Sequence, residues 1–160
     1  MDVLRSQDTR AQLAAAVPVA RLQPCPPEGG SLELVFEVPG GRAAPNAARR
    51  VLLEKDGALP EGMRADLLLL LSELVSNAVL HGRVGPESSI GIDVRGADRV
   101  LRVEVTDPGA GFDWERRRRE RPRREGGFGL ALVERIAESW GIERQRGHTL
   151  VWFELRTPAR

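Results

Sequence analysis

Residues 89–107 read SIGIDVRGADRVLRVEVTD and decide the fold, because two runs of alternating apolar and polar side chains flank a short RGAD connection. Alternation with a period of two is typical of strands that bury one face. Two such strands joined by a tight turn pair in antiparallel fashion. This stretch therefore predicts a β-hairpin and favours an α+β sandwich over a doubly wound parallel sheet.

The segments on either side of the hairpin predict a two-layer α+β sandwich, with a mixed, mainly antiparallel sheet covered on one face by about three helices. Alternation predicts strands in SLELVFEVPG, from Leu32 to Val38, and in the last segment, HTLVWFELR. Helical spacing predicts helices over residues 45–57, from after LPEG to His81, and over FGLALVERIAESWG up to Gly141. The middle helix is apolar nearly all round and is expected to be central.

The length and composition fit one globular domain, since the chain has 160 residues and is 41% hydrophobic and 29% charged. We expect this domain at residues 31–157, after a loosely ordered N-terminal arm at residues 1–30 in which a short helix could form around Thr9–Val17. No targeting or membrane-spanning segment is expected. The 24 basic and 23 acidic residues nearly cancel, which argues against general nucleic-acid binding. The single cysteine, Cys25, suits a reducing cytoplasm.

The helix that ends at His81 carries two polar side chains one turn apart, Glu73 and Asn77, where its other residues are apolar. An amide oxygen is a hard ligand for magnesium, and a carboxylate can orient or deprotonate an attacking hydroxyl. The pair could therefore serve a magnesium-nucleotide site. The alternative is a helix edge that faces solvent, with His81 and Gly82 as a C-terminal cap.

A second candidate region follows the hairpin, where Asp107 ends a strand and begins the sequence DPGAG. A carboxylate at this place can accept a hydrogen bond from an exocyclic amine. The glycines beside it, Gly109 and Gly111, would let the backbone approach a flat base. The alternative is an ordinary turn, because Asp-Pro-Gly is a common turn sequence.

A third candidate region consists of residues 112–126, expected to be a mobile lid, and the glycines that follow. Gly126, Gly127 and Gly129 precede the last predicted helix, where backbone amides attract phosphate; a flexible hinge is the alternative. The lid could close over a triphosphate or dock on an acidic partner, unless it is only a solvated loop. Its seven arginines are Arg116, Arg117, Arg118, Arg119, Arg121, Arg123 and Arg124.

The order and spacing of these regions resemble the GHKL ATPase superfamily, and most closely the anti-sigma-factor serine/threonine kinases of bacterial partner-switching systems. SELVSNAVLHG looks like the N box of that family, VTDPGAGFD like its first glycine box and GGFGLALVERIAESWG like its second. The resemblance covers roughly Leu32 to Leu155. It implies the GHKL, or Bergerat, fold.

The resemblance also implies a role for each matching residue. Asn77 would coordinate the magnesium ion held by the phosphates of ATP, and Glu73 would be the base for the incoming hydroxyl. Asp107 would bind the adenine amino group, with Gly109 and Gly111 lining the base. The other implied nucleotide-binding positions are Gly127, Gly129 and Leu130 at the phosphates and Thr149, whose hydroxyl helps the aspartate.

The activity that the resemblance implies is transfer of the ATP γ-phosphoryl group to a serine or threonine of an anti-anti-sigma antagonist. The protein would also sequester a sigma factor, as a cytoplasmic homodimer that contacts neither membrane nor nucleic acid directly. The segment between Gly111 and Gly126 is shorter and richer in arginine than the lids of these kinases. It motivates an alternative in which ATP is only a switch for binding a regulator. A third hypothesis is a domain that has lost nucleotide binding and works only by protein contacts.

Overall fold

The computed structural model describes residues 32–55, 59, 61–97, 99–109, 128–145 and 147–156. The expected N-terminal arm, its short helix and the lid lie outside the described residues. In the part of the chain that is described, no helix is long and apolar enough to cross a membrane.

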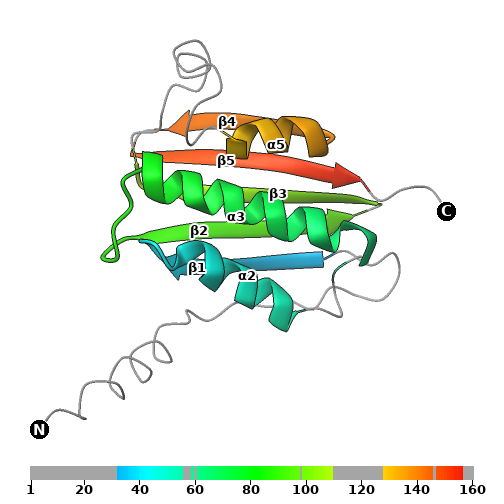
Figure 1. Ribbon diagram of the computed structural model, residues 1–160, viewed down its shortest axis with the longest axis horizontal. Coiled ribbons are helices and arrows are strands. Elements are labelled where there is room, and N and C mark those ends of the chain that lie inside the picture. Colours follow the sequence, from blue (N-terminus) through cyan, green and yellow to red (C-terminus); the bar gives the residue numbers. More distant parts are fainter. Residues whose placement is uncertain are drawn as a thin grey trace, which may run out of the picture.

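Five strands form one sheet, and the helices cover a single face of it (Figure 1). The strands are β1 (Leu32–Pro39), β2 (Ser89–Ala97), β3 (Val100–Asp107), β4 (Ser139–Gln145) and β5 (His148–Arg156). The order across the sheet is β1-β2-β3-β5-β4, and all four neighbouring pairs are antiparallel. The helices are α2 (Ala44–Glu54), α3 (Arg64–His81) and α5 (Phe128–Ile136), with a 3-10 turn, η2, at Glu61–Met63. The predicted two-layer α+β fold is confirmed, with the difference that the described strands form a purely antiparallel sheet and not a mixed one.

The hairpin at residues 89–107 is present as predicted. Ala97 of β2 pairs with Val100 of β3, so only two residues connect the strands, and Arg99 has a φ of 85° at this turn. Positive φ matches the twist that a two-residue hairpin connection needs. The alternating residues of both strands point inward and form the centre of the core; they are Ile90, Ile92, Val94, Leu101, Val103 and Val105.

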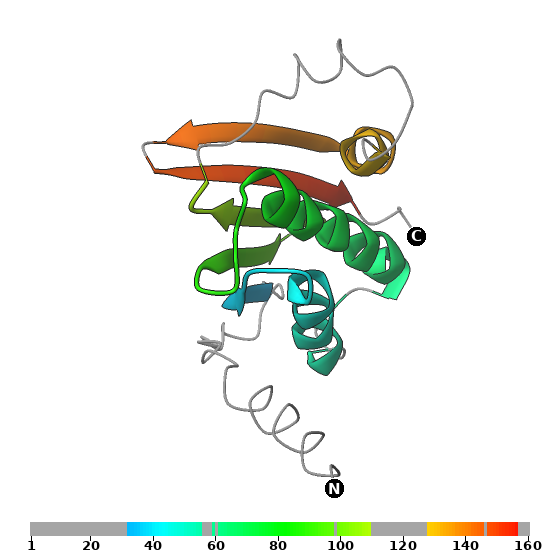
Figure 2. The same ribbon diagram turned by 60° about the vertical axis from the view of Figure 1, so that its left-hand side comes forward.

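Helix α3 crosses the middle of the sheet, and both views show it between α2 and α5 (Figures 1 and 2). Most of its apolar residues face inward, and its most completely buried side chains include Leu67, Leu70 and Leu71. The side chain of Leu80 is 68% exposed. The predicted central helix is therefore confirmed, although its apolar sequence does not bury it on every side.

The prediction of one long helix over FGLALVERIAESWG is wrong in its second half. Helix α5 ends at Ile136, and residues from Ser139 onward form the edge strand β4. The Glu138 N–H donates to the Glu154 carbonyl of β5 at 2.9 Å, and the segment then pairs along β5. The Ala137 N–H still donates to the Val133 carbonyl of α5 at 2.8 Å, so the free edge of β5 overrides the helical preference only from Glu138 onward. Pairing there satisfies backbone groups that a frayed helix end would leave open.

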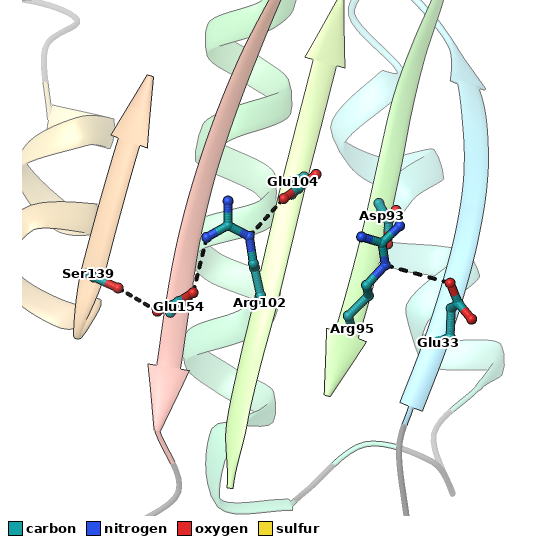
Figure 3. A network of polar contacts seen from close by, with 7 residues as sticks. All are labelled: Glu33, Asp93, Arg95, Arg102, Glu104, Ser139 and Glu154. Carbon is teal, nitrogen blue, oxygen red and sulfur yellow. Dashed lines mark hydrogen bonds and ion pairs between the residues drawn. The ribbon is translucent and has the colours of Figure 1, made fainter. Parts of the chain in front are cut away.

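The other face of the sheet carries a polar network (Figure 3). Arg102 donates to Glu104 at 2.7 Å and to Glu154 at 3.0 Å, and Ser139 donates to Glu154 at 2.6 Å. These hydrogen bonds hold the pKa of Glu154 below its ordinary value. The Arg102 guanidinium also stacks on the Trp152 indole, 3.9 Å from the ring centroid, a favourable cation–π geometry.

We expect Gly141→Ala to destabilise the fold, because a Cβ at this position would lie 2.8 Å from the Trp152 ring. The indole is held by Arg102 and cannot move aside freely, so overpacking should cost about 1–2 kcal/mol of unfolding free energy. Gly91→Ala is the matched control on the same face, because its nearest neighbour would be Thr106 at 3.8 Å. Urea unfolding of both variants measures the difference; equal stabilities would contradict the packing argument.

Candidate functional site

The first part of the site lies on α3, where Glu73 and Asn77 are both half-buried and one turn apart. The side-chain nitrogen Nδ2 of Asn77 is buried and has no hydrogen-bond partner among the residues that the structure describes. An unsatisfied buried amide costs about 1–3 kcal/mol, so it persists where a ligand can satisfy it. A helix edge that only faces solvent does not account for this buried atom.

The second part of the site is the turn after β3, built around a buried carboxylate. Asp107 is only 5% exposed, and its Oδ1 accepts a hydrogen bond from the Gly109 N–H at 2.8 Å. Thr149, opposite Asp107 on β5, donates its hydroxyl to the Gly109 carbonyl at 3.1 Å. Thr149 therefore supports Asp107 through the Gly109 turn. The three residues act as one unit although they come from two strands that are far apart in the sequence.

Burial raises the pKa of the Asp107 carboxyl above its ordinary value of 3.8. The hydrogen bond from the Gly109 N–H and the positive charge on His148 partly oppose this shift. Removal of water strengthens the hydrogen bonds that an ionised carboxylate accepts. A group with N–H donors that reached this turn would therefore meet a strong acceptor.

The two parts of the site meet at Gly82, the residue that follows the last residue of α3. A Cβ at Gly82 would lie 2.5 Å from Asp107 Oδ1, and a Cβ at Gly109 would lie 2.7 Å from Gly82 Cα. The end of α3 therefore packs directly on the Asp107 turn. The sequence predicted Gly82 only as the end of the helix. It could not predict this contact, because a glycine that ends a helix and a glycine that packs on a neighbouring turn look the same in a sequence.

The remaining predicted positions lie at the start of α5 or outside the described residues. Gly129 and Leu130 belong to the first turn of α5, and the Leu130 side chain is buried in the core. Helix α5 packs against α3, so its first turn belongs to the same layer as Asn77. Backbone amides at a helix start can bind phosphate. Gly111, Gly127 and residues 112–126 lie outside the described part.

The residues present fit a magnesium ion that arrives with phosphates better than an ion held by protein side chains alone. In the described ranges, no group of three or more histidine, cysteine, aspartate or glutamate residues could hold a metal ion. Magnesium commonly takes one or two protein ligands and completes its shell with water and phosphate oxygens. The amide oxygen of Asn77 suits such a single-ligand role, while its buried nitrogen Nδ2 is a donor that a phosphate oxygen could satisfy.

Comparison with known proteins bears on the family and the fold of the chain. The family model described as the histidine kinase-like ATPase domain matches residues 42–155. No curated protein matches the chain. Among solved structures, that of the RsbU and RsbW domains of Rv1364c from Mycobacterium tuberculosis matches with a TM-score of 0.58 and 24% sequence identity. The match covers 81% of this chain and 34% of that chain, so this chain spans about a third of its length and shares its fold.

Proposed function

Because the chain belongs to the family of histidine kinase-like ATPase domains, we propose that it binds ATP with magnesium and acts as a regulatory protein of the anti-sigma-factor type. In this proposal it transfers the γ-phosphoryl group of ATP to a serine or threonine of an anti-anti-sigma antagonist. The fold that the chain shares with a structure containing an RsbW domain supports a regulatory protein of the anti-sigma-factor type. The observation that carries the proposal is the buried amide nitrogen of Asn77, which has no hydrogen-bond partner among the described residues. It lies one turn from Glu73, on the helix whose end packs on Asp107.

The proposed binding roles follow from the chemistry of each group. Asp107 accepts a hydrogen bond from the adenine amino group, and the backbone of Gly109 lines the base. Asn77 holds the magnesium ion, which neutralises charge on the phosphates when it is bound. The start of α5, at Gly129 and Leu130, offers backbone amides to the phosphates, together with Gly127. Gly111 lines the base, and Thr149 holds the Gly109 turn in place.

The proposed reaction needs only one proton-accepting side chain. The serine or threonine oxygen of the antagonist forms a bond to the γ-phosphorus while the bond to the bridging β–γ oxygen breaks, and ADP leaves. Glu73 takes the hydroxyl proton, because its carboxylate lies one turn from Asn77 on the same helix face. Positioning and charge neutralisation supply most of the catalysis in reactions of this class.

The proposed biological setting is partner switching in the cytoplasm. Phosphorylation of the antagonist releases it, and the domain is then free to hold a sigma factor inactive, as a homodimer. Residues 31–157 would be the ATP-binding domain in this setting, with residues 112–126 as its lid and residues 1–30 as an arm outside it. Direct contact with DNA or membrane has no part in this proposal.

A second candidate function is a switch in which ATP binding alone controls the capture of a regulator. The seven arginines of residues 112–126 favour it, because so short and basic a segment departs from the lids of the kinases that the chain resembles. The kinase and the switch differ only in whether the bound ATP is consumed in phosphoryl transfer. A domain that acts without any nucleotide is the third and weakest candidate, since it leaves the buried Asn77 amide unexplained.

Two measurements test these candidates in order. Calorimetric titration with magnesium-ATP should show binding; no binding would exclude both nucleotide-dependent functions. Incubation with γ-labelled ATP and candidate antagonists should then transfer label to the antagonist. Tight ATP binding without transfer, together with ATP-dependent capture of a regulator in a pull-down, would favour the switch over the kinase.

ATP binding is expected to weaken as the pH falls through the raised pKa of Asp107, because protonation removes the charged acceptor of the adenine amine. Weakening should begin at a higher pH than for an aspartate with its ordinary pKa of 3.8. Titrations at several pH values measure this step. Asp107→Asn is the control, since an amide does not titrate and protonation of ATP itself affects both proteins alike. A step of equal size in that variant would contradict the assignment.

A further inference from the structure

We propose that Gly82 is a positioning residue for base recognition: by lacking a side chain, it lets the end of α3 press on Asp107 and direct its carboxylate toward the adenine amine. This inference rests on the proposed function. It adds a residue that the motif roles do not include, and it links the helix of Glu73 and Asn77 to the base-binding turn.

The backbone conformation of Gly82 shows why a glycine is needed here. Its φ of −73° and ψ of −12° lie in the right-handed helical region, which every residue type adopts easily. Many helices end in a glycine because its φ is positive, but this requirement is absent at Gly82. The requirement is space, since a Cβ would lie 2.5 Å from both the Ala78 carbonyl oxygen and Asp107 Oδ1.

The contact between Gly82 and Gly109 closes the turn from the opposite side. A Cβ on Gly109 would meet Gly82 Cα and the Gly82 carbonyl oxygen, both at 2.7 Å, and Asp107 Oδ1 at 2.6 Å. Two glycine backbones therefore enclose a single carboxylate oxygen. The Gly109 N–H holds that oxygen at 2.8 Å, and the Thr149 hydroxyl holds the Gly109 carbonyl.

This enclosure determines which oxygen of Asp107 serves the ligand. Oδ1 is committed to the Gly109 N–H and lies against the end of α3. We therefore assign Oδ2 as the atom that accepts the hydrogen bond from the adenine amine. The direction of Oδ2 is fixed once Oδ1 is held in place. A side chain at position 82 would push Oδ1 away and turn Oδ2 out of line, and hydrogen bonds weaken steeply with misalignment.

The test compares two ligands on the full chain: magnesium-ATP and the magnesium complex of purine riboside triphosphate, which lacks only the exocyclic amine. The unmodified protein should bind ATP about 10- to 100-fold more tightly, the range for a hydrogen bond to a charged group. In Gly82→Ala the affinities for the two ligands should differ by no more than about threefold. Gly85→Ala, in the next loop, is the matched control, because its Cβ would meet nothing within 4 Å, and it should keep the ratio.

The outcomes separate this inference from the proposed function. If the unmodified protein binds neither ligand, the proposed function itself is lost. If it discriminates between the ligands and Gly82→Ala discriminates equally well, the positioning role is wrong and the function stands. Thermal melting shows whether Gly82→Ala folds. If this variant does not fold, NMR amide spectra of the unmodified protein provide the test. The Gly82 amide resonance should have different chemical shifts when the protein is saturated with ATP and with the analogue. Identical chemical shifts would overturn the inference.

Discussion

Glu73→Gln is expected to abolish phosphoryl transfer to the antagonist while leaving magnesium-ATP binding within about threefold of the unmodified protein. Glutamine keeps the shape of the side chain and its place on α3 but cannot accept the hydroxyl proton. General-base catalysis contributes about 10²–10⁴-fold to a rate, so transfer should fall by that factor. Single-turnover assays with labelled ATP and the purified antagonist measure the rate directly.

Glu54→Gln is the matched control for this experiment, since Glu54 is an exposed glutamate at the end of the neighbouring helix α2 and should leave transfer unchanged. Equal transfer by Glu73→Gln and the unmodified protein would remove Glu73 from the role of base. Loss of ATP binding in Glu73→Gln would instead place Glu73 in the nucleotide contacts. The non-catalytic switch predicts that no variant alters turnover, because turnover is absent in the unmodified protein.

The local pattern of the chain is enough to predict most of its architecture. Alternation in residues 89–107 identified the hairpin, and the apolar sequence around Leu70 and Leu74 placed α3 at the centre. These features depend on neighbours in sequence, which propensity and periodicity describe well. The family resemblance supplied the Bergerat arrangement, and the shared fold with the RsbW-containing structure agrees with it.

The strand β4 could not be predicted in the same way. Residues 137–140 read AESW and continue the helical composition of α5, but Trp140 pairs with Phe153 of β5 and Gly141 lies under the Trp152 indole. Both contacts join β4 to a different strand, so neither is visible in the local sequence. Tertiary pairing decides the outcome there, and local propensity is only a weak prior.

In the candidate site, too, features set by neighbours in the sequence could be predicted, whereas contacts between distant segments could not. Glu73 and Asn77 are one helical turn apart, so their shared face follows from spacing alone. The support of Asp107 by Thr149 through Gly109, and the packing of Gly82 on the carboxylate, depend on where β5 and the end of α3 meet. The family resemblance predicted a role for Thr149 but did not identify the Gly109 carbonyl as its hydrogen-bond partner. The packing of Gly82 on Asp107 was visible only in the structure.

Asp107→Asn is expected to weaken magnesium-ATP binding by about 10- to 100-fold, because the neutral amide offers the adenine amine an uncharged acceptor in place of a charged one. The amide oxygen of the substituted side chain can still accept the Gly109 N–H, so the turn should keep its shape. Calorimetric titration measures the loss. Asp93→Asn is the matched control: burial also raises the pKa of Asp93, but this residue lies on the sheet face away from the helices and should not affect ATP.

Stability measurements distinguish this loss of binding from unfolding. Because burial raises the pKa of folded Asp107, the folded chain takes up this proton at a higher pH than the unfolded chain. The carboxyl therefore stabilises the fold below its unfolded pKa and loses that contribution as the pH rises through its folded pKa. Above the folded pKa the buried, ionised carboxylate destabilises the folded state, so Asp107→Asn should melt no lower than the unmodified protein there. Weaker ATP binding with an undiminished melting temperature would assign Asp107 to the nucleotide; a lower melting temperature would assign it to the fold.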